Sequence, residues 1–191
     1  VESVSQKWSY LEIDEMVQTY AQAMLGEDIK SQDRILIYLP SEIKLVEIIL
    51  ACFEIGAIAT PISTRLTKSE RNAVIEKIQP KLIITNWQLK PILTSSSLPL
   101  APVSPIEELP NSSGGCSVIT NNYKINLEDV AAIILTSGTT GIPKAVQLSY
   151  GNFEASCNNW NEFLQFQAND QFLCCLPLHH IGGLAVMLRA L

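Results

Sequence analysis

The sequence predicts an α/β fold in which parallel or mixed sheets carry helices on both faces. Short apolar runs rich in Ile, Leu and Val alternate with longer segments that show helical periodicity and helix caps. Runs that are apolar at nearly every position are typical of strands buried on both faces. Alternation of such strands with helices at this spacing indicates βαβ units, so we expect a mainly parallel sheet.

Three helices are expected in the first unit, residues 1–90. Two of them open with a capping box, in which a Ser or Thr and a Glu three residues later satisfy each other's backbone N–H groups. The boxes are Ser9 with Glu12 and Thr67 with Glu70. The helices are expected over residues 9–26, 42–55 and 67–79. The strands between them are expected at residues 34–39, 57–60 and 82–85.

Residues 91–126 interrupt this pattern. The part from residue 91 to residue 115 holds five of the ten prolines and six serines, a composition typical of linkers. We therefore interpret residues 91–126 as a linker or surface excursion and not as a packed element. A second α/β unit, residues 127–191, follows it. Its strands are expected at residues 130–135, 144–149 and 171–176, and its helices over residues 153–164 and from about Gly183 onward.

The composition limits the partners. The chain has 191 residues, 47% of them hydrophobic, and no apolar run approaches the roughly 20 residues that a membrane span needs. The formal net charge of −6 makes nucleic acid a poor partner, because nucleic-acid sites need a basic surface. Any anionic ligand must then be held by local geometry. A homo-oligomer is compatible with the sequence.

The five cysteines form an odd set without metal-ligand spacing. Together with the lack of a signal-peptide pattern, they indicate reduced thiols and a cytoplasmic protein. We predict no metal-ligand cluster within this chain. The sequence starts at Val1 and stops at Leu191 inside a helical pattern that no cap closes, so we expect a piece of a longer protein.

The loop after the strand at residues 130–135 carries the clearest chemical signal. Phosphate binding needs converging backbone N–H groups, which glycine permits, together with hydroxyl donors and a cation. The spacing here matches neither G-x-x-x-x-G-K-[ST] nor G-x-G-x-x-G, which disfavours a simple NTPase or a dinucleotide site. We interpret the loop as a triphosphate clamp, and the alternative is a hairpin turn with exposed hydroxyls. The candidate phosphate ligands are Thr136, Ser137, Gly138, Thr139, Thr140, Gly141 and Lys144.

The same stretch, TSGTTGIPK, resembles the phosphate loop of the adenylate-forming superfamily, which includes acyl-CoA synthetases, luciferases and peptide-synthetase adenylation domains. The resemblance covers nearly the whole chain, including DRILIYLPSEIKLVEIILACFEIGAIATPIS before the loop and LPLHHIGGL after it. It implies the partial N-terminal domain of an adenylate-forming enzyme. Ala145 departs from the family pattern, which has Gly there. We expect the added methyl group to be tolerated unless this residue needs a positive φ.

The resemblance implies an enzyme with two half-reactions. A carboxylate attacks the α-phosphate of ATP, which gives acyl-AMP and pyrophosphate, and the thiol of CoA then attacks the acyl carbon. ATP with Mg²⁺ and CoA are the implied cofactor and co-substrates. The loop residues would hold the β- and γ-phosphates, with Lys144 as a catalytic cation that stabilises the leaving pyrophosphate.

The family pattern also places His180 beside the acyl pocket, where it is a second catalytic and substrate-binding candidate. The alternative is an ordinary pair of histidines at a strand end, a reading that suits His179. Gly182 and Gly183 either open space for the acyl group or begin a helix. Arg189 either meets a substrate carboxylate or stays solvated.

Within the superfamily, the pattern LPLxHIxGLxxxxRxL and the short segments resemble o-succinylbenzoate–CoA ligases of menaquinone and phylloquinone biosynthesis most. The alternatives are a fatty-acyl- or aryl-CoA ligase, a peptide-synthetase-type adenylation domain, and a non-enzymatic α/β module that binds a nucleotide or a protein. The family's adenine and Mg²⁺ motifs and its C-terminal lysine cannot be assigned in this chain. We therefore expect the 191-residue piece alone to be inactive.

Overall fold

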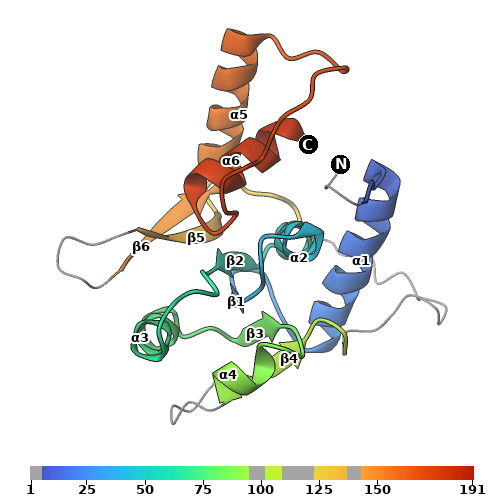
Figure 1. Ribbon diagram of the computed structural model, residues 1–191. Coiled ribbons are helices and arrows are strands. Elements are labelled where there is room, and N and C mark those ends of the chain that lie inside the picture. The colour runs from blue at the N-terminus through green and yellow to red at the C-terminus, as the bar shows by residue number, and fades with distance from the viewer. Residues whose placement is uncertain (1–5, 95–101, 109–122, 137–142) are drawn as a thin grey trace.

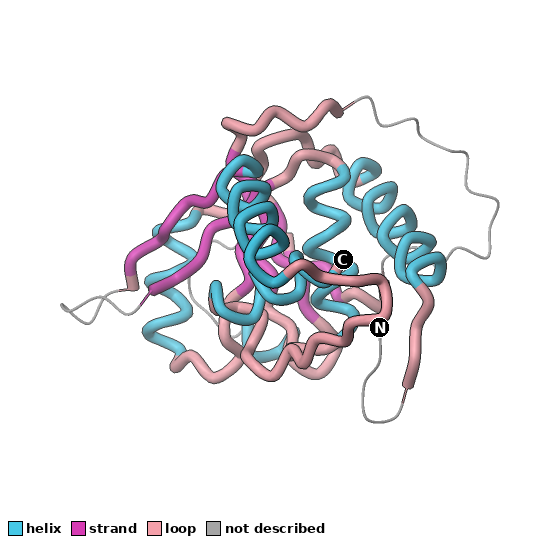
Figure 2. The backbone as a smooth tube through the Cα atoms, turned by 90° about the horizontal axis from the view of Figure 1, so that it is seen from above, coloured by secondary structure: helices cyan, strands magenta, loops and turns pink. Residues whose placement is uncertain are grey.

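The structure is organised around one sheet (Figure 1; Figure 2). The computed structural model describes residues 6–94, 102–108, 123–136 and 143–191. Within these residues, six strands join in the order β4-β3-β1-β2-β5-β6. The strands are β1 Arg34–Ile37, β2 Ile58–Pro61, β3 Leu82–Thr85, β4 Val103–Pro105, β5 Val130–Thr136 and β6 Lys144–Ser149. The helices are α1 Tyr10–Gly26, α2 Ile43–Glu54, α3 Lys68–Ile78, α4 Lys90–Thr94, α5 Tyr150–Leu164 and α6 Ile181–Ala190.

The sheet is mixed. Neighbouring strands from β4 to β5 are parallel, and β5 and β6 form an antiparallel pair. Parallel neighbours need a crossover connection, which α2 supplies between β1 and β2. Helix α3 leads from β2 to β3, which pairs with β1 on its other side. The predicted α/β fold with a mixed sheet is therefore confirmed.

The two faces of the sheet carry different helices (Figure 1). Side chains from α1, α2, α5 and α6 form one cluster, the α2 core, and side chains from α3 and α4 form the other, the α3 core. Strand β1 shows why both faces are covered, since Ile35 and Ile37 enter the α2 core while Leu36 enters the α3 core. All three are fully buried, and each contributes about 1.5–3 kcal/mol.

The helix starts follow local side-chain chemistry. The capping boxes predicted at Ser9 and Thr67 are present, and each box closes with backbone and side-chain hydrogen bonds to the Glu three residues later. A third box, Ser149 with Asn152, opens α5, with the Ser149 backbone N–H donating to the Asn152 side chain at 3.0 Å. Asn in place of Glu hides this box from the usual pattern.

The segment interpreted as a linker does contain packed elements. Helix α4 buries Leu93, and β4 joins the edge of the sheet beside β3, followed by the buried Ile106. The expectation that nothing packs there is wrong for these residues. Proline is tolerated in β4 because an edge strand leaves one row of backbone groups outside the ladder. A single sheet contains strands from both predicted units. The division of the chain into two units therefore stays a prediction.

The strand predicted at residues 171–176 is absent. These residues are irregular and exposed, with Leu173 83% exposed. The run QFLCCL is mostly apolar but has no β-branched residue, which weakens its preference for a strand. A strand also requires a neighbour with unpaired backbone groups. In the described part of the chain these residues pair with no strand of the sheet.

Glu47 is a buried carboxylate between two helices. It lies on α2, 5% exposed, and burial raises the pKa of its carboxyl, while Lys44 partly opposes the shift. Burial and the charge of Glu47 raise the pKa of Tyr20 on α1 to about 12. An acid whose pKa is raised by folding costs stability as the pH rises from its unfolded value through its folded value.

We therefore expect Glu47→Gln to raise the melting temperature of the complete protein at pH 8 by about 2 °C or more, with little effect at pH 4. Thermal unfolding at the two pH values measures the difference. Glu76→Gln, which removes an exposed carboxylate from α3, serves as the matched control. Equal shifts at both pH values would contradict the assignment.

Candidate functional site

The stem of the predicted phosphate loop lies at the carboxyl end of the sheet. Thr136, the last residue of β5, pairs with Lys144, the first residue of β6, and both are exposed. Since β5 runs parallel to β2, Thr136 marks the edge at which open parallel sheets bind their ligands. The remaining loop candidates, Ser137, Gly138, Thr139, Thr140 and Gly141, lie outside the described residues.

The stem residues divide between the two faces of the sheet. Leu135 and Ala145 pack against the α3 core. Successive side chains of a strand point to opposite faces, so Thr136 and Lys144 leave the sheet on the face of α2 and α6. Ala145 is not among the described residues with a positive φ, so its methyl group is tolerated as expected.

A turn at residues 177–180 carries the two histidines to the same edge. The Leu178 backbone N–H donates to Ser41 Oγ at 3.2 Å, and Ser41 lies in the connection that follows β1. The ring centroids of His179 and His180 lie 4.4 Å apart, and His180 is the N-cap residue of α6. Burial lowers the pKa of His179, and the charges of His180 and Arg65 lower it further. Neutral imidazole is therefore favoured at His179.

The two glycines after the histidines are packing residues. A Cβ at Gly183 would lie 2.4 Å from the Pro177 carbonyl oxygen and 2.5 Å from that of Leu176. A Cβ at Gly182 would lie 2.9 Å from Leu176 Cδ1. The glycines thus let the first turn of α6 lie directly on the histidine turn, which fixes where His180 starts the helix.

Arg189 lies against α5 and not beside His180. Its Nη2 donates to Ser156 Oγ at 2.9 Å, and its guanidinium lies 4.7 Å from the Trp160 ring centroid. It follows His180 by nine residues, or about 13 Å along the helix axis. The structure therefore brings Thr136 together with Lys144 and sets His180 on the same edge, but it does not bring Arg189 to that group.

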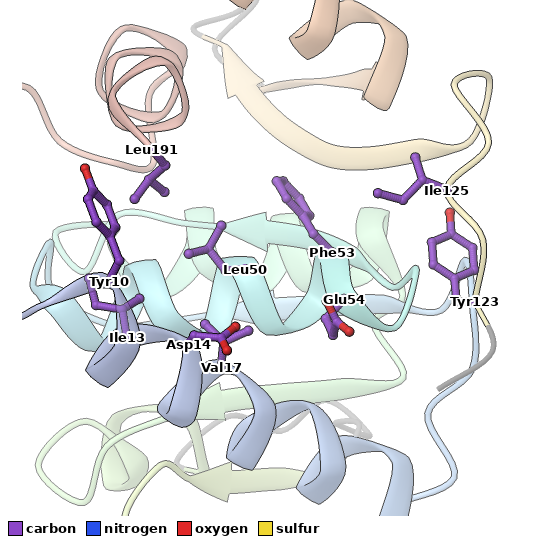
Figure 3. Close-up of a pocket in the computed structure, with 10 residues that line it drawn as sticks. All are labelled: Tyr10, Ile13, Asp14, Val17, Leu50, Phe53, Glu54, Tyr123, Ile125 and Leu191. Carbon is purple, nitrogen blue, oxygen red and sulfur yellow. The ribbon is translucent and has the colours of Figure 1, made fainter. Parts of the chain in front are cut away.

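An apolar groove lies elsewhere, between α1 and α2 (Figure 3). Its volume is about 540 Å³, and Asp14 and Glu54 are the acidic residues in its lining. The lining residues are Tyr10, Ile13, Asp14, Val17, Leu50, Phe53, Glu54, Tyr123, Ile125 and Leu191. None of the candidate site residues lines it, so the groove is separate from the loop stem and the histidine turn.

The described residues contain no group of three His, Cys, Asp or Glu side chains placed to hold a metal ion. No helix among them is both long and apolar enough to cross a bilayer.

Sequence reasoning missed three residues that support this edge. Ser41 receives the Leu178 N–H, Arg65 lies near enough to His179 to lower its pKa, and Lys77 donates from Nζ to the Pro143 carbonyl oxygen at 2.9 Å. None of the three belongs to a local motif that predicts its partner. Each contact joins segments far apart in the sequence, so no pattern along the chain could have indicated it.

A mostly parallel sheet, with a Thr–Lys loop stem and a histidine turn at its carboxyl edge, places the chain in the class of α/β proteins that bind ligands at that edge. The match to known families is more specific. Residues 1–191 match the AMP-binding enzyme family, and the chain belongs to that family.

The curated relatives are longer proteins. The chain is 34% identical over 182 residues to a 2-succinylbenzoate–CoA ligase of Oceanobacillus iheyensis, which covers 95% of this chain and 37% of the relative. A 2-succinylbenzoate–CoA ligase of Staphylococcus epidermidis is 31% identical, with 95% and 36% covered. The chain thus spans little more than a third of the length of these relatives.

A solved structure has the same fold. O-succinylbenzoate coenzyme A synthetase from Bacillus subtilis, in complex with AMP, superimposes with a TM-score of 0.87 at 24% identity. The match covers 98% of this chain and 48% of that one. The structural match therefore confirms the fold, which this chain shares with about half of that synthetase.

Gly183→Ala tests the packing of the histidine turn. We expect a loss of about 1–3 kcal/mol in the free energy of unfolding of the complete protein, because the new methyl group meets two backbone carbonyls. Urea unfolding measures it. Gly26→Ala is the matched control, since a Cβ there meets nothing within 4 Å. Equal effects of the two substitutions would show that the close approach at Gly183 is not what holds the turn.

His179→Phe tests the effect of the half-buried imidazole. Because folding lowers the pKa of His179, its contribution to stability is present above the ordinary value near 6.5 and is lost as the pH falls below it. We expect the variant to lose less stability than the wild type between pH 7.5 and pH 5.5. Thermal unfolding at both pH values measures this, and an unchanged loss in the variant would count against the assignment.

Proposed function

We propose that the complete protein is an ATP-dependent acid–thiol ligase that forms an acyl-AMP and then an acyl-CoA. In the first step a carboxylate oxygen attacks the α-phosphorus of ATP, and pyrophosphate leaves. In the second step the sulfur of CoA attacks the acyl carbon, and AMP leaves. Membership of the AMP-binding enzyme family supports the first step.

The observation that carries the proposal is the loop stem. The pairing of Thr136 with Lys144 puts a hydroxyl and an ammonium group side by side at the ligand edge of the sheet. Negative charge builds on the pyrophosphate as it leaves, and a fixed cation stabilises that charge more in the transition state than in the ground state. We propose that Ser137, Gly138, Thr139, Thr140 and Gly141 add donors to the same phosphates.

The acid we propose is o-succinylbenzoate, which would place the protein in menaquinone or phylloquinone biosynthesis. Two relatives that are 34% and 31% identical to this chain are 2-succinylbenzoate–CoA ligases, which supports this choice. His180 is proposed to line the carboxylate site, with Gly182 and Gly183 holding its turn in place. The contacts of Arg189 with α5 favour a structural role for that side chain over contact with the acid.

Mg²⁺ is proposed to accompany ATP as a counterion of the phosphates. One solved synthetase of similar fold is in complex with ATP and a magnesium ion. The metal would neutralise phosphate charge when bound. Lys144 would add a second positive charge. Among the described residues, it is the cation at the loop stem on the face of α6.

Pyrophosphate release by the complete protein tests the proposal. With ATP and a panel of carboxylates, with and without CoA, we expect release to be fastest with o-succinylbenzoate. Release with fatty or aryl acids in its place would favour the other CoA ligases, and a requirement for a carrier-protein thiol would favour a peptide-synthetase type. Nucleotide binding without release for any acid would favour the non-enzymatic module.

Lys144→Ala should slow pyrophosphate release on the order of 100-fold, because the charge on the leaving group loses its fixed partner. Steady-state release with saturating ATP measures the change. Lys124→Ala, which removes an exposed lysine from the segment before β5, is the matched control and should leave the rate unchanged. An unchanged rate in Lys144→Ala would reject the role assigned to this residue.

A further inference from the structure

The loop stem is anchored to α3 by a contact outside the known motif. Gln79, in the left-handed conformation, ends α3 and donates its backbone N–H to the Ile75 carbonyl oxygen at 2.8 Å. This ending leaves Lys77 in the last turn of α3. From there Lys77 Nζ donates to the Pro143 carbonyl oxygen at 2.9 Å, across 66 positions of sequence. Pro143 directly precedes Lys144.

Apolar packing holds the stem on the same side. Val74, Ile75 and Ile78 of α3 belong to the α3 core, and Leu135 and Ala145 pack against that core. The two stem strands therefore pack against the same core, one through Leu135 and the other through Ala145. The methyl group of Ala145 adds an apolar contact that glycine could not make.

These anchors bracket Lys144. The residue before it is held through its carbonyl oxygen by Lys77, and the residue after it packs on the α3 core. Lys144 itself points to the opposite face, where α6 and the histidine turn lie. Helix α3 holds the backbone before Lys144 through Lys77, and the α3 core holds the residue after it, while the side chain of Lys144 stays exposed.

We propose that Lys77 is a positioning residue for Lys144. The inference rests on the proposed function, because it assigns to Lys77 the backbone placement from which Lys144 stabilises the leaving pyrophosphate. Lys77 does not need to touch the substrate. An electrostatic contact made only in the transition state is lost with small displacements, so a loosened stem lowers the rate more than it weakens ATP binding.

Lys77→Ala in the complete protein tests the inference through pyrophosphate release. We expect kcat to fall roughly three- to tenfold, the effect of losing one hydrogen bond, with the KM for ATP changed less than twofold. Lys77→Arg keeps a donor at the end of a long side chain and should retain most of the rate. Lys68→Ala, at the other end of α3, is the matched control and should behave as the wild type.

A double-mutant cycle separates positioning from an independent effect. In the Lys144→Ala background we expect Lys77→Ala to have no further effect, because Lys77 acts through Lys144. A wild-type kcat in Lys77→Ala, an equal loss in Lys68→Ala, or the same fold loss with and without Lys144 would each overturn the inference. Melting temperatures of the variants show whether a loss of rate reflects unfolding.

The outcome also separates this inference from the proposed function. If Lys144→Ala slows release but Lys77→Ala does not, the ligase proposal stands and only the role of Lys77 is overturned. If Lys144→Ala releases pyrophosphate at the wild-type rate, the roles of Lys144 and Lys77 are both overturned and the ligase proposal stands. If the wild-type protein releases no pyrophosphate with any acid, the ligase proposal itself is overturned.

Discussion

The parallel pairing of β2 with β5 is the interaction on which the rest of the site depends. The strands meet where Ala59 faces Ala132, both fully buried. The side chain of Gln32 supports the start of β5, since its amide donates to the Val130 carbonyl oxygen at 3.1 Å and accepts from the Val130 N–H at 3.3 Å. A side-chain amide thus replaces a backbone partner where the ladder is short. This junction puts the β5–β6 stem beside the loops that follow β1 and β2.

The same edge concentrates cationic and polar groups in a chain of net charge −6. The overall field of such a chain repels anions, and the local arrangement must overcome it. Lys144 at the stem, held between Pro143 and Ala145, does this without a large basic surface. The histidine turn is brought to that edge by the hydrogen bond from Leu178 to Ser41 and by the close approach that Gly183 permits.

Most of the fold was predictable because its signals are local. Capping boxes at Ser9 and Thr67 and continuous apolar runs in β1, β2 and β3 depend on residues a few positions apart. The failures share a cause. Strand β4 forms in a Pro- and Ser-rich segment because it pairs with β3, whereas residues 171–176 remain irregular and pair with no strand of the described sheet.

The sequence by itself determined the chemistry of the site: glycines, hydroxyls and one lysine in TSGTTGIPK, and a pair of histidines after the next helix. Only the tertiary structure decided how these groups are oriented and which residues they contact. It paired Thr136 with Lys144, directed both to the face of α6, held Pro143 through Lys77 and turned Arg189 onto Trp160. Residue types set which bonds are possible, but those contacts join distant segments, and packing of the whole sheet selects among their possible partners.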